Sequence, residues 1–221
     1  MRLWTFWRSS CSWRVRIALA YKMLDAEQIS VHLQRQGGEQ FQPVYKALNP
    51  MAQVPTLGLK DENGQEAWTL SQSLAIMEYL DERHPEPPIL PKTQKARAQV
   101  RQVAEVINSG IQPLQNSSVL KRIESMGYDK RIWARDWIQD GLDKLETMVA
   151  GASNYDFLYS EHPTIAEFCL IPQLYNARRF GCEMSNWNRL REVETRCLAL
   201  NAFDVSHPSQ QNDATEEAVQ N

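Results

Sequence analysis

Four prolines within eight residues divide this chain into two parts with different sequence patterns. Pro85, Pro87, Pro88 and Pro91 all lie in the segment that begins at His84. Proline lacks an amide hydrogen and fixes its own backbone angle, so such a density ends helices and stiffens a linker. We therefore predict a first domain over residues 1–84, a linker over 85–91 and a second domain over 92–221.

The first part alternates short apolar runs with helical patterns. The expected elements are, in order, a strand over 3–7, a helix over 13–24, a strand over 28–33, a hairpin of strands over 54–59 and 67–70, and a helix over 72–83. The turn residues from Asp61 to Gly64 are typical of a hairpin. Ser71 is the expected N-cap of the last helix.

The second part shows only helical patterns. Apolar residues recur at helical spacing over 96–111 and 138–149. Thr164 and Glu167 have the T-x-x-E form of a capping box, which predicts the start of a further apolar helix. Pro172 is expected to kink that helix or to disturb its first turns. The second domain is therefore expected to be all helical.

Composition and charge exclude several function classes. The net charge of −3 gives no basic field for nucleic acid or an anionic membrane, and no stretch is long and apolar enough to span a bilayer. The four cysteines show neither C-x-x-C spacing nor histidines at zinc spacing, and the N-terminus lacks a signal-like apolar run. We expect a cytoplasmic protein without nucleic-acid, membrane or metal binding. The polar segment from Ser206 on is expected to be loose at its end.

The segment from Ser9 to Arg16 follows a predicted strand and opens a helix. Helix N-termini stabilise anions, and a serine hydroxyl there can donate a hydrogen bond to a thiolate. A plain serine N-cap would also explain the serines. Arg14 and Arg16 lie where the helix dipole disfavours cations, so with Arg8 upstream they indicate an anionic ligand, while solvated surface arginines remain the alternative. Cys11 is an alternative nucleophile, since a helix N-terminus lowers a thiol pKa.

Two later turns are further candidates for ligand contact. Val54 precedes a proline that opens a strand, which is most often only a turn device. Gln72 and Ser73 stand at the next helix start, where amides and hydroxyls can bind a carboxylate. Each signal is weak alone, and their order along the chain makes them stronger together.

With these segments in view, the chain resembles the zeta class of glutathione transferases over nearly its whole length. The likeness is carried by residues 9–19 (SSCSWRVRIAL), 47–57, 72–76, 110–116, 176–180 and 205–208. It implies an α+β fold, the glutathione transferase fold, with a thioredoxin-like N-terminal domain and an all-α C-terminal domain. It also implies a homodimer.

The resemblance implies roles for individual residues. Ser9 would activate glutathione, with Ser10 and Cys11 beside the sulfur. Val54 would bind the cysteinyl backbone of glutathione, and Gln72 and Ser73 would hold its γ-glutamyl carboxylate. Further contacts to glutathione or substrate are implied for Gln40, Gln112, Asn116 and Ser118. A small dianionic substrate would be bound by Arg8, Arg14 and Arg179.

The implied activity is the glutathione-dependent cis–trans isomerisation of maleylacetoacetate to fumarylacetoacetate, a step of phenylalanine and tyrosine catabolism, with glutathione as cofactor. One alternative is an isomerase that acts on maleylpyruvate, and another is a general transferase that also accepts α-haloacids. A non-catalytic binding module of the same fold is the third. The intact set Ser9, Val54, Gln72 and Ser73 argues against the last of these.

Overall fold

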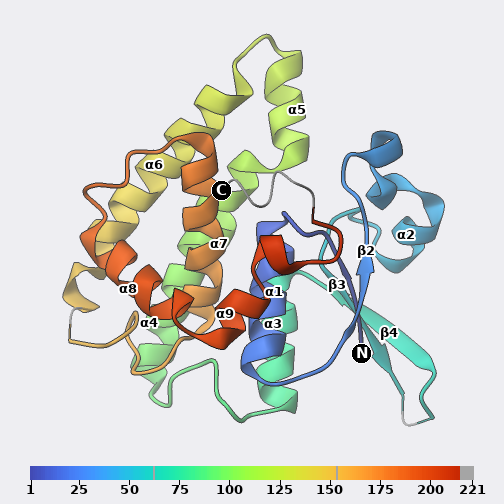
Figure 1. Ribbon diagram of the computed structural model, residues 1–221, viewed down its shortest axis with the longest axis horizontal. Helices are drawn as coiled ribbons and strands as arrows, with labels where there is room; N and C mark the ends of the chain where they lie inside the picture. The colour runs from blue at the N-terminus through green and yellow to red at the C-terminus, as the bar shows by residue number, and fades with distance from the viewer. Residues whose placement is uncertain (62, 153, 215–221) are drawn as a thin grey trace. The chain divides into compact units, whose positions relative to one another are not determined.

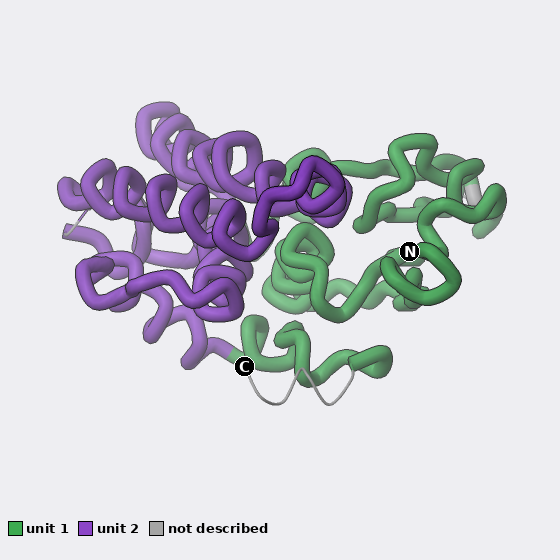
Figure 2. Tube along the Cα trace, turned by 90° about the horizontal axis from the view of Figure 1, so that it is seen from above, with its two compact units in different colours: residues 1–88, 201–220 green, residues 89–200, 221 purple. Residues whose placement is uncertain are grey.

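The computed structural model describes residues 1–61, 63–152 and 154–214 (Figure 1). The chain divides into two compact units (Figure 2). Among the described residues, the first unit comprises Met1–Pro88 and 201–214, and the second comprises Ile89–Leu200. The first division therefore falls inside the proline-dense segment, and the chain returns to the first unit at Asn201.

A four-stranded mixed sheet forms the centre of the first unit. The strands are β1 (Arg2–Thr5), β2 (Glu27–Ser30), β3 (Thr56–Lys60) and β4 (Glu66–Ser71), in the spatial order β2-β1-β3-β4. β1 is parallel to β2 and antiparallel to β3, so that Leu3 lies opposite both Gln28 and Leu57. β3 and β4 form the predicted antiparallel hairpin. The thioredoxin-like arrangement implied by the resemblance is confirmed.

Helices α1 (Ser10–Tyr21) and α3 (Ser73–Arg83) pack side by side next to this sheet (Figure 1). Their contact faces and the inner face of the strands supply the fully buried apolar side chains of the unit, which include Leu3, Ile17, Leu57, Ile76 and Leu80. Burial of this apolar surface is the main force that holds the unit together. A short helix that the sequence did not predict, α2 (Pro43–Leu48), begins with proline at its first position.

The kinds and order of the predicted elements are confirmed, with their ends shifted by a few residues. β1 ends at Thr5 because the chain turns there, and the Ser9 amide donates to the Phe6 carbonyl at 3.0 Å. The prediction that Ser71 caps α3 is wrong. Ser71 is still paired with Thr56 in the sheet, and Gln72 occupies the cap position instead.

The described part of the second unit is helical, as predicted. Its α-helices are α4 (Gln94–Glu105), α5 (Ser117–Ser125), α6 (Lys130–Val149), α7 (Ile165–Phe180) and α8 (Asn188–Leu198). A π-helical segment, Val106–Ile111, follows α4. The capping box is confirmed: the Thr164 side chain accepts from the start of α7, and the Glu167 carboxylate accepts from the Thr164 amide at 2.7 Å. Pro172 lies within α7, which runs as one helix.

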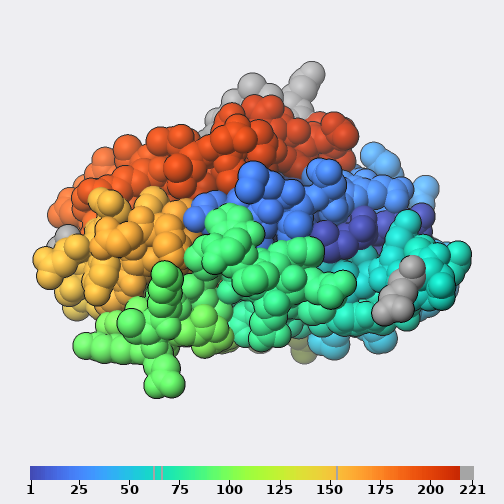
Figure 3. Space-filling model, turned by 90° about the horizontal axis from the view of Figure 1, so that it is seen from below, coloured from blue at the N-terminus to red at the C-terminus, as the bar shows by residue number. Residues whose placement is uncertain are grey.

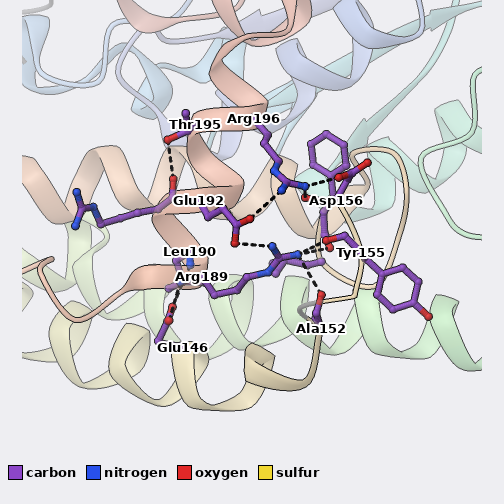
Figure 4. A network of polar contacts seen from close by, with 12 residues as sticks. Glu146, Ala152, Tyr155, Asp156, Arg189, Leu190, Glu192, Thr195 and Arg196 are labelled. Atoms are coloured by element: carbon purple, nitrogen blue, oxygen red, sulfur yellow. Dashed lines mark hydrogen bonds and ion pairs between the residues drawn. The ribbon is translucent and has the colours of Figure 1, made fainter.

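A buried arginine joins α8 to the loop that follows α6. The Arg189 guanidinium donates to the backbone carbonyls of Ala152, Tyr155 and Phe157 at 2.7–3.1 Å (Figure 4). It also forms an ion pair with Glu192 at 2.9 Å. One side chain therefore donates to three backbone carbonyls after α6, which need hydrogen-bond partners when they are buried.

The chain beyond Asn201 adds α9 (Asn201–Val205) and a 3₁₀ turn, Pro208–Gln210, to the first unit. α9 packs on α1, and Figure 3 shows these late residues, in red, against the early residues, in blue. The Trp13 indole donates to the Ser206 hydroxyl at 3.1 Å and meets the His207 ring edge to face. The expected loose end falls beyond residue 214, outside the described residues, whereas residues 206–214 make specific contacts.

Candidate active site

The turn between β1 and α1 presents Ser9 at a helix N-terminus. Ser9 is the N-cap of α1, and its Oγ accepts from the Ser12 amide at 3.2 Å. Because that oxygen acts as the acceptor, the hydroxyl proton is free to be donated to another group. Ser9 and Cys11 are half-buried, and Ser10 is buried. Ser9 and the first amides of α1 therefore form a site suited to an anion such as a thiolate.

Arg16 does not face a ligand. Its side chain is buried and donates to the Phe6 carbonyl at 3.2 Å, the Trp7 carbonyl at 2.9 Å, the Thr5 hydroxyl at 3.0 Å and the Ser206 carbonyl at 3.3 Å. Burial lowers the pKa of this guanidinium to about 9. The expectation that Arg16 marks an anionic ligand is wrong, because its donors are bound by three backbone carbonyls and the Thr5 hydroxyl of the protein itself.

Arg14 connects two of the predicted ligand-binding turns. Its guanidinium donates to the Ser73 Oγ at 3.2 Å, which joins the start of α1 to the start of α3. Arg14 is fully buried, and Ser73 is 3% exposed. The structure thus places Arg14 beneath Ser73 rather than at an open surface. Arg8 is half-buried, and its guanidinium lies 5.2 Å from the centre of the Trp7 ring.

The start of α3 has an unusual backbone. Gln72 has a φ of 73°, a region that non-glycine residues seldom adopt and that often marks a ligand-binding turn. Gln72 is exposed, and its side chain forms no capping hydrogen bond with the first amides of α3. Uncapped amides at a helix N-terminus are ready to receive a carboxylate.

The turn before β3 is fixed by two side chains that the sequence did not single out. The Gln53 carbonyl accepts from the Tyr45 hydroxyl at 2.6 Å and from the Asn49 side-chain amide at 2.7 Å. Val54 follows, and the Val54–Pro55 bond is cis. Burial raises the pKa of Tyr45, so this phenol stays a hydrogen-bond donor at neutral pH. Tyr45 and Asn49 therefore hold the backbone at Val54.

Gln40 offers a buried acceptor in the same unit. Its Nε2 donates to the Leu33 carbonyl at 3.3 Å. Its Oε1 is buried and has no hydrogen-bond partner within the described part of the chain. Buried polar atoms are almost always satisfied, so this oxygen points to a donor on a ligand or a water. Gly38 lies directly against the Gln40 amide group.

The remaining predicted site residues lie in the second unit, so their part in a common site stays a prediction. Gln112 begins a 3₁₀ turn just after the π-helical segment. Asn116 is the N-cap of α5 and accepts from the amide and hydroxyl of Ser118 at 3.3 and 3.4 Å. Arg179 lies in the last turn of α7, with its guanidinium 5.0 Å from the centre of the Phe180 ring.

Residues 8–83 match the model of the glutathione S-transferase N-terminal domain. Maleylacetoacetate isomerase of Mus musculus is 42% identical and aligns with 97% of this chain and 95% of its own. The enzyme of Pseudomonas aeruginosa is 41% identical over 96% of this chain and 98% of its own.

Two solved structures extend the likeness to the fold. Maleylacetoacetate isomerase of Anaeromyxobacter dehalogenans with bound GSH has a TM-score of 0.88 and 46% identity, and the match covers 97% of both chains. A bacterial maleylpyruvate isomerase, described as a zeta-class glutathione S-transferase, has a TM-score of 0.89 and 34% identity, and the match covers 97% of this chain and all of that one. The chain belongs to the zeta-class glutathione transferases.

All four cysteines of this zeta-class transferase are free. Burial raises the pKa of the Cys182 thiol to about 11 and that of the Cys197 thiol well above its usual value. These two groups are therefore protonated and weakly nucleophilic at neutral pH. Among the described residues no group of acidic, histidine or cysteine side chains could hold a metal ion, and no described helix is long and apolar enough to cross a membrane.

Proposed function

We propose that the protein is a glutathione-dependent cis–trans isomerase that converts maleylacetoacetate to fumarylacetoacetate. The observation that carries the proposal is the Arg14–Ser73 hydrogen bond, which joins the Ser9-capped start of α1 to the uncapped start of α3. The full-length relatives named as maleylacetoacetate isomerases support the choice of substrate. The related structure with GSH in its active site supports the choice of cofactor.

The residues of the first unit fit glutathione. The uncapped amides of α3, with Gln72 and Ser73, would hold the γ-glutamyl carboxylate. The Val54 backbone, held in place through Gln53, would bind the cysteinyl part. The unpartnered Gln40 Oε1 would accept a donor of the peptide. These contacts would bring the sulfur toward the start of α1.

Ser9 and the N-terminus of α1 would lower the pKa of the bound thiol. A free cysteine thiol has a pKa of about 8.5, so only a small fraction is ionised at neutral pH. A donated hydrogen bond and a helix dipole both favour the charged form. When bound, glutathione supplies a thiol that adds to the cis double bond, which permits rotation before elimination restores a trans double bond.

The charged groups of the substrate require cationic partners. Arg8 and Arg179 are the proposed substrate-binding arginines. Each is only half-buried, and each has its guanidinium beside an aromatic ring. Arg14 is proposed to act through Ser73 on the γ-glutamyl end, since it is fully buried against that hydroxyl. Gln112, Asn116 and Ser118 are proposed as further contacts.

A substrate comparison tests the proposed function. The purified protein should convert maleylacetoacetate to fumarylacetoacetate only when glutathione is present. Maleylpyruvate is the second candidate substrate, because related structures at 34% and 37% identity are maleylpyruvate isomerases. If the protein conjugates an aryl halide faster than it isomerises either maleyl compound, it is a general transferase and not an isomerase. If the protein binds glutathione but turns over none of these substrates, it is a non-catalytic binding module.

Substitution at Gly38 should weaken glutathione binding. A Cβ at Gly38 would lie 2.7 Å from the Gln40 amide atoms and would displace that side chain. Losing one hydrogen bond costs about 0.5–1.5 kcal/mol, so Gly38→Ala should raise the Kd for glutathione about three- to tenfold in calorimetry. Gly37→Ala is the control, because Gly37 also has positive φ but nothing within 4 Å of its Cβ position. Equal Kd values for the two variants would show that Gln40 does not contribute to glutathione binding.

We also propose a cytoplasmic homodimer. Four free cysteines favour a reducing compartment, and the family resemblance supports the dimer. Sedimentation equilibrium at micromolar concentration should give twice the 25.5 kDa mass of the chain. A monomer mass would contradict the proposal.

A further inference from the structure

The turn that carries Ser9 is held by a residue from the far end of the chain. The Trp7 amide donates to the Asp213 carboxylate at 3.2 Å, across 206 positions of sequence. The same carboxylate oxygen accepts from the Ser30 hydroxyl at 2.7 Å, at the end of β2. Asp213 therefore connects the end of β2 to the residue that lies two positions before Ser9.

Arg16 binds carbonyl groups of the same turn, whereas Asp213 binds one of its amides. Its guanidinium donates to the carbonyls of Phe6 and Trp7. It also donates to the Ser206 carbonyl, at the start of residues 206–214, which are called the late segment below. Asp213 attracts this buried cation. Both the amide and the carbonyl of Trp7 are thus bound by charged side chains, which make stronger hydrogen bonds than neutral ones.

The late segment is also packed against the base of the turn. Ala214 packs against an apolar cluster formed by the buried residues Trp4, Phe6, Trp7, Val31, Tyr45 and Val54. Its amide donates to the Gln211 carbonyl at 2.9 Å, and the Gln211 side chain donates to the His207 carbonyl at 2.9 Å. The segment around Asp213 is therefore fixed on both sides, so the carboxylate has a defined place from which to hold the Trp7 amide.

Trp7 and Ser9 belong to the same backbone turn. The Ser9 amide donates to the Phe6 carbonyl, so residues 6–9 form one closed turn. Three of its backbone groups are fixed by Arg16 and Asp213. A displacement of about 1 Å in a reacting group can cost about a hundredfold in rate.

We propose that Asp213 is a positioning residue for Ser9, which keeps the β1–α1 turn in the geometry that lets the Ser9 hydroxyl reach the sulfur of bound glutathione. The inference rests on the proposed function for its catalytic consequence. Its structural part, the Asp213 bond to the Trp7 amide, can be tested without turnover. If Asp213 held only the late segment in place, its replacement would leave Ser9 unaffected.

The test uses the full chain with Asp213→Ala and Asp213→Asn. Loss of the acceptor in Asp213→Ala should lower kcat/KM about tenfold and raise the thiol pKa of bound glutathione, followed by thiolate absorbance. Amide hydrogen exchange should become faster at Trp7. Asp213→Asn keeps an acceptor oxygen and should restore most of the protection at Trp7. Asp25→Asn, at an exposed residue between α1 and β2, is the charge-matched control and should behave as wild type.

The outcomes separate this inference from the proposed function. An unchanged thiol pKa in Asp213→Ala would overturn the positioning role. So would exchange that accelerates equally throughout the first unit, since that result shows a general loss of stability. If wild type shows no isomerase activity while the thiol pKa and the Trp7 exchange respond, the proposed function fails and the inference stands. If wild type is fully active and neither variant responds, the inference fails and the proposed function stands.

Discussion

Replacing Ser9 by alanine should raise the thiol pKa of bound glutathione and lower kcat/KM about 10²–10³-fold, the usual effect of removing one donor to a developing anion. The Ser9 Oγ already accepts from the Ser12 amide, so its proton is directed away from the helix. No other group at this turn combines a hydroxyl with the cap position. Thiolate absorbance of the complex across a pH series gives the pKa, and steady-state assays give the rate.

Two comparisons separate thiol activation from loss of a helix cap. Thr93 caps α4 through the Ala96 amide at 3.2 Å, the same distance as in the Ser9 cap. Thr93→Ala should therefore lose similar stability, about 1 kcal/mol, with the thiol pKa unchanged. Cys11→Ala should leave that pKa close to wild type. If Cys11→Ala raises the thiol pKa and Ser9→Ala does not, the two roles are reversed.

The largest expected loss of stability comes from Arg189→Ala. This change removes a donor from three backbone carbonyls after α6, of which the Ala152 carbonyl also accepts from the Tyr155 amide at 3.3 Å (Figure 4). Unpaired buried polar groups are costly, so the free energy of unfolding should fall by about 3–5 kcal/mol. Urea unfolding followed by circular dichroism measures the change.

Arg191 provides the matched control for Arg189. It lies on the same helix, two residues further on, and is exposed. Arg191→Ala should change the free energy of unfolding by no more than about 0.5 kcal/mol, as is usual at a surface. A loss below about 1 kcal/mol in Arg189→Ala would mean that water replaces the guanidinium at all three carbonyls.

Local signals in the sequence predicted the order of elements well. The Thr164–Glu167 box depends on two side chains three positions apart, so the sequence pattern contains both partners. Ser71 was misassigned because a hydroxyl before a helix is the ordinary cap, whereas here the chain stays in the sheet until Gln72. α2 was missed because it has six residues and gives little periodic pattern.

Contacts between distant residues could not be predicted in the same way. The sequence shows that Arg14 and Arg16 are cations near a helix start, but the Ser73 hydroxyl bound by Arg14 and the Ser206 carbonyl that is one acceptor of Arg16 lie 59 and 190 positions away. Without those partners in view, the pattern indicates two ligand-binding arginines. Tyr45 shows the same limit, since nothing near it in sequence marks the Gln53 carbonyl as its acceptor.

The return of the chain to the first unit at Asn201 has a consequence for synthesis on the ribosome. Domains generally fold in the order in which they emerge. Here residues 1–88 emerge first, but the Ser206 carbonyl bound by Arg16 and the Ser206 hydroxyl bound by Trp13 follow only after the whole second unit has been translated. Until then Arg16 and Trp13 lack these two partners. Premature termination late in the message would therefore damage the domain that was translated first.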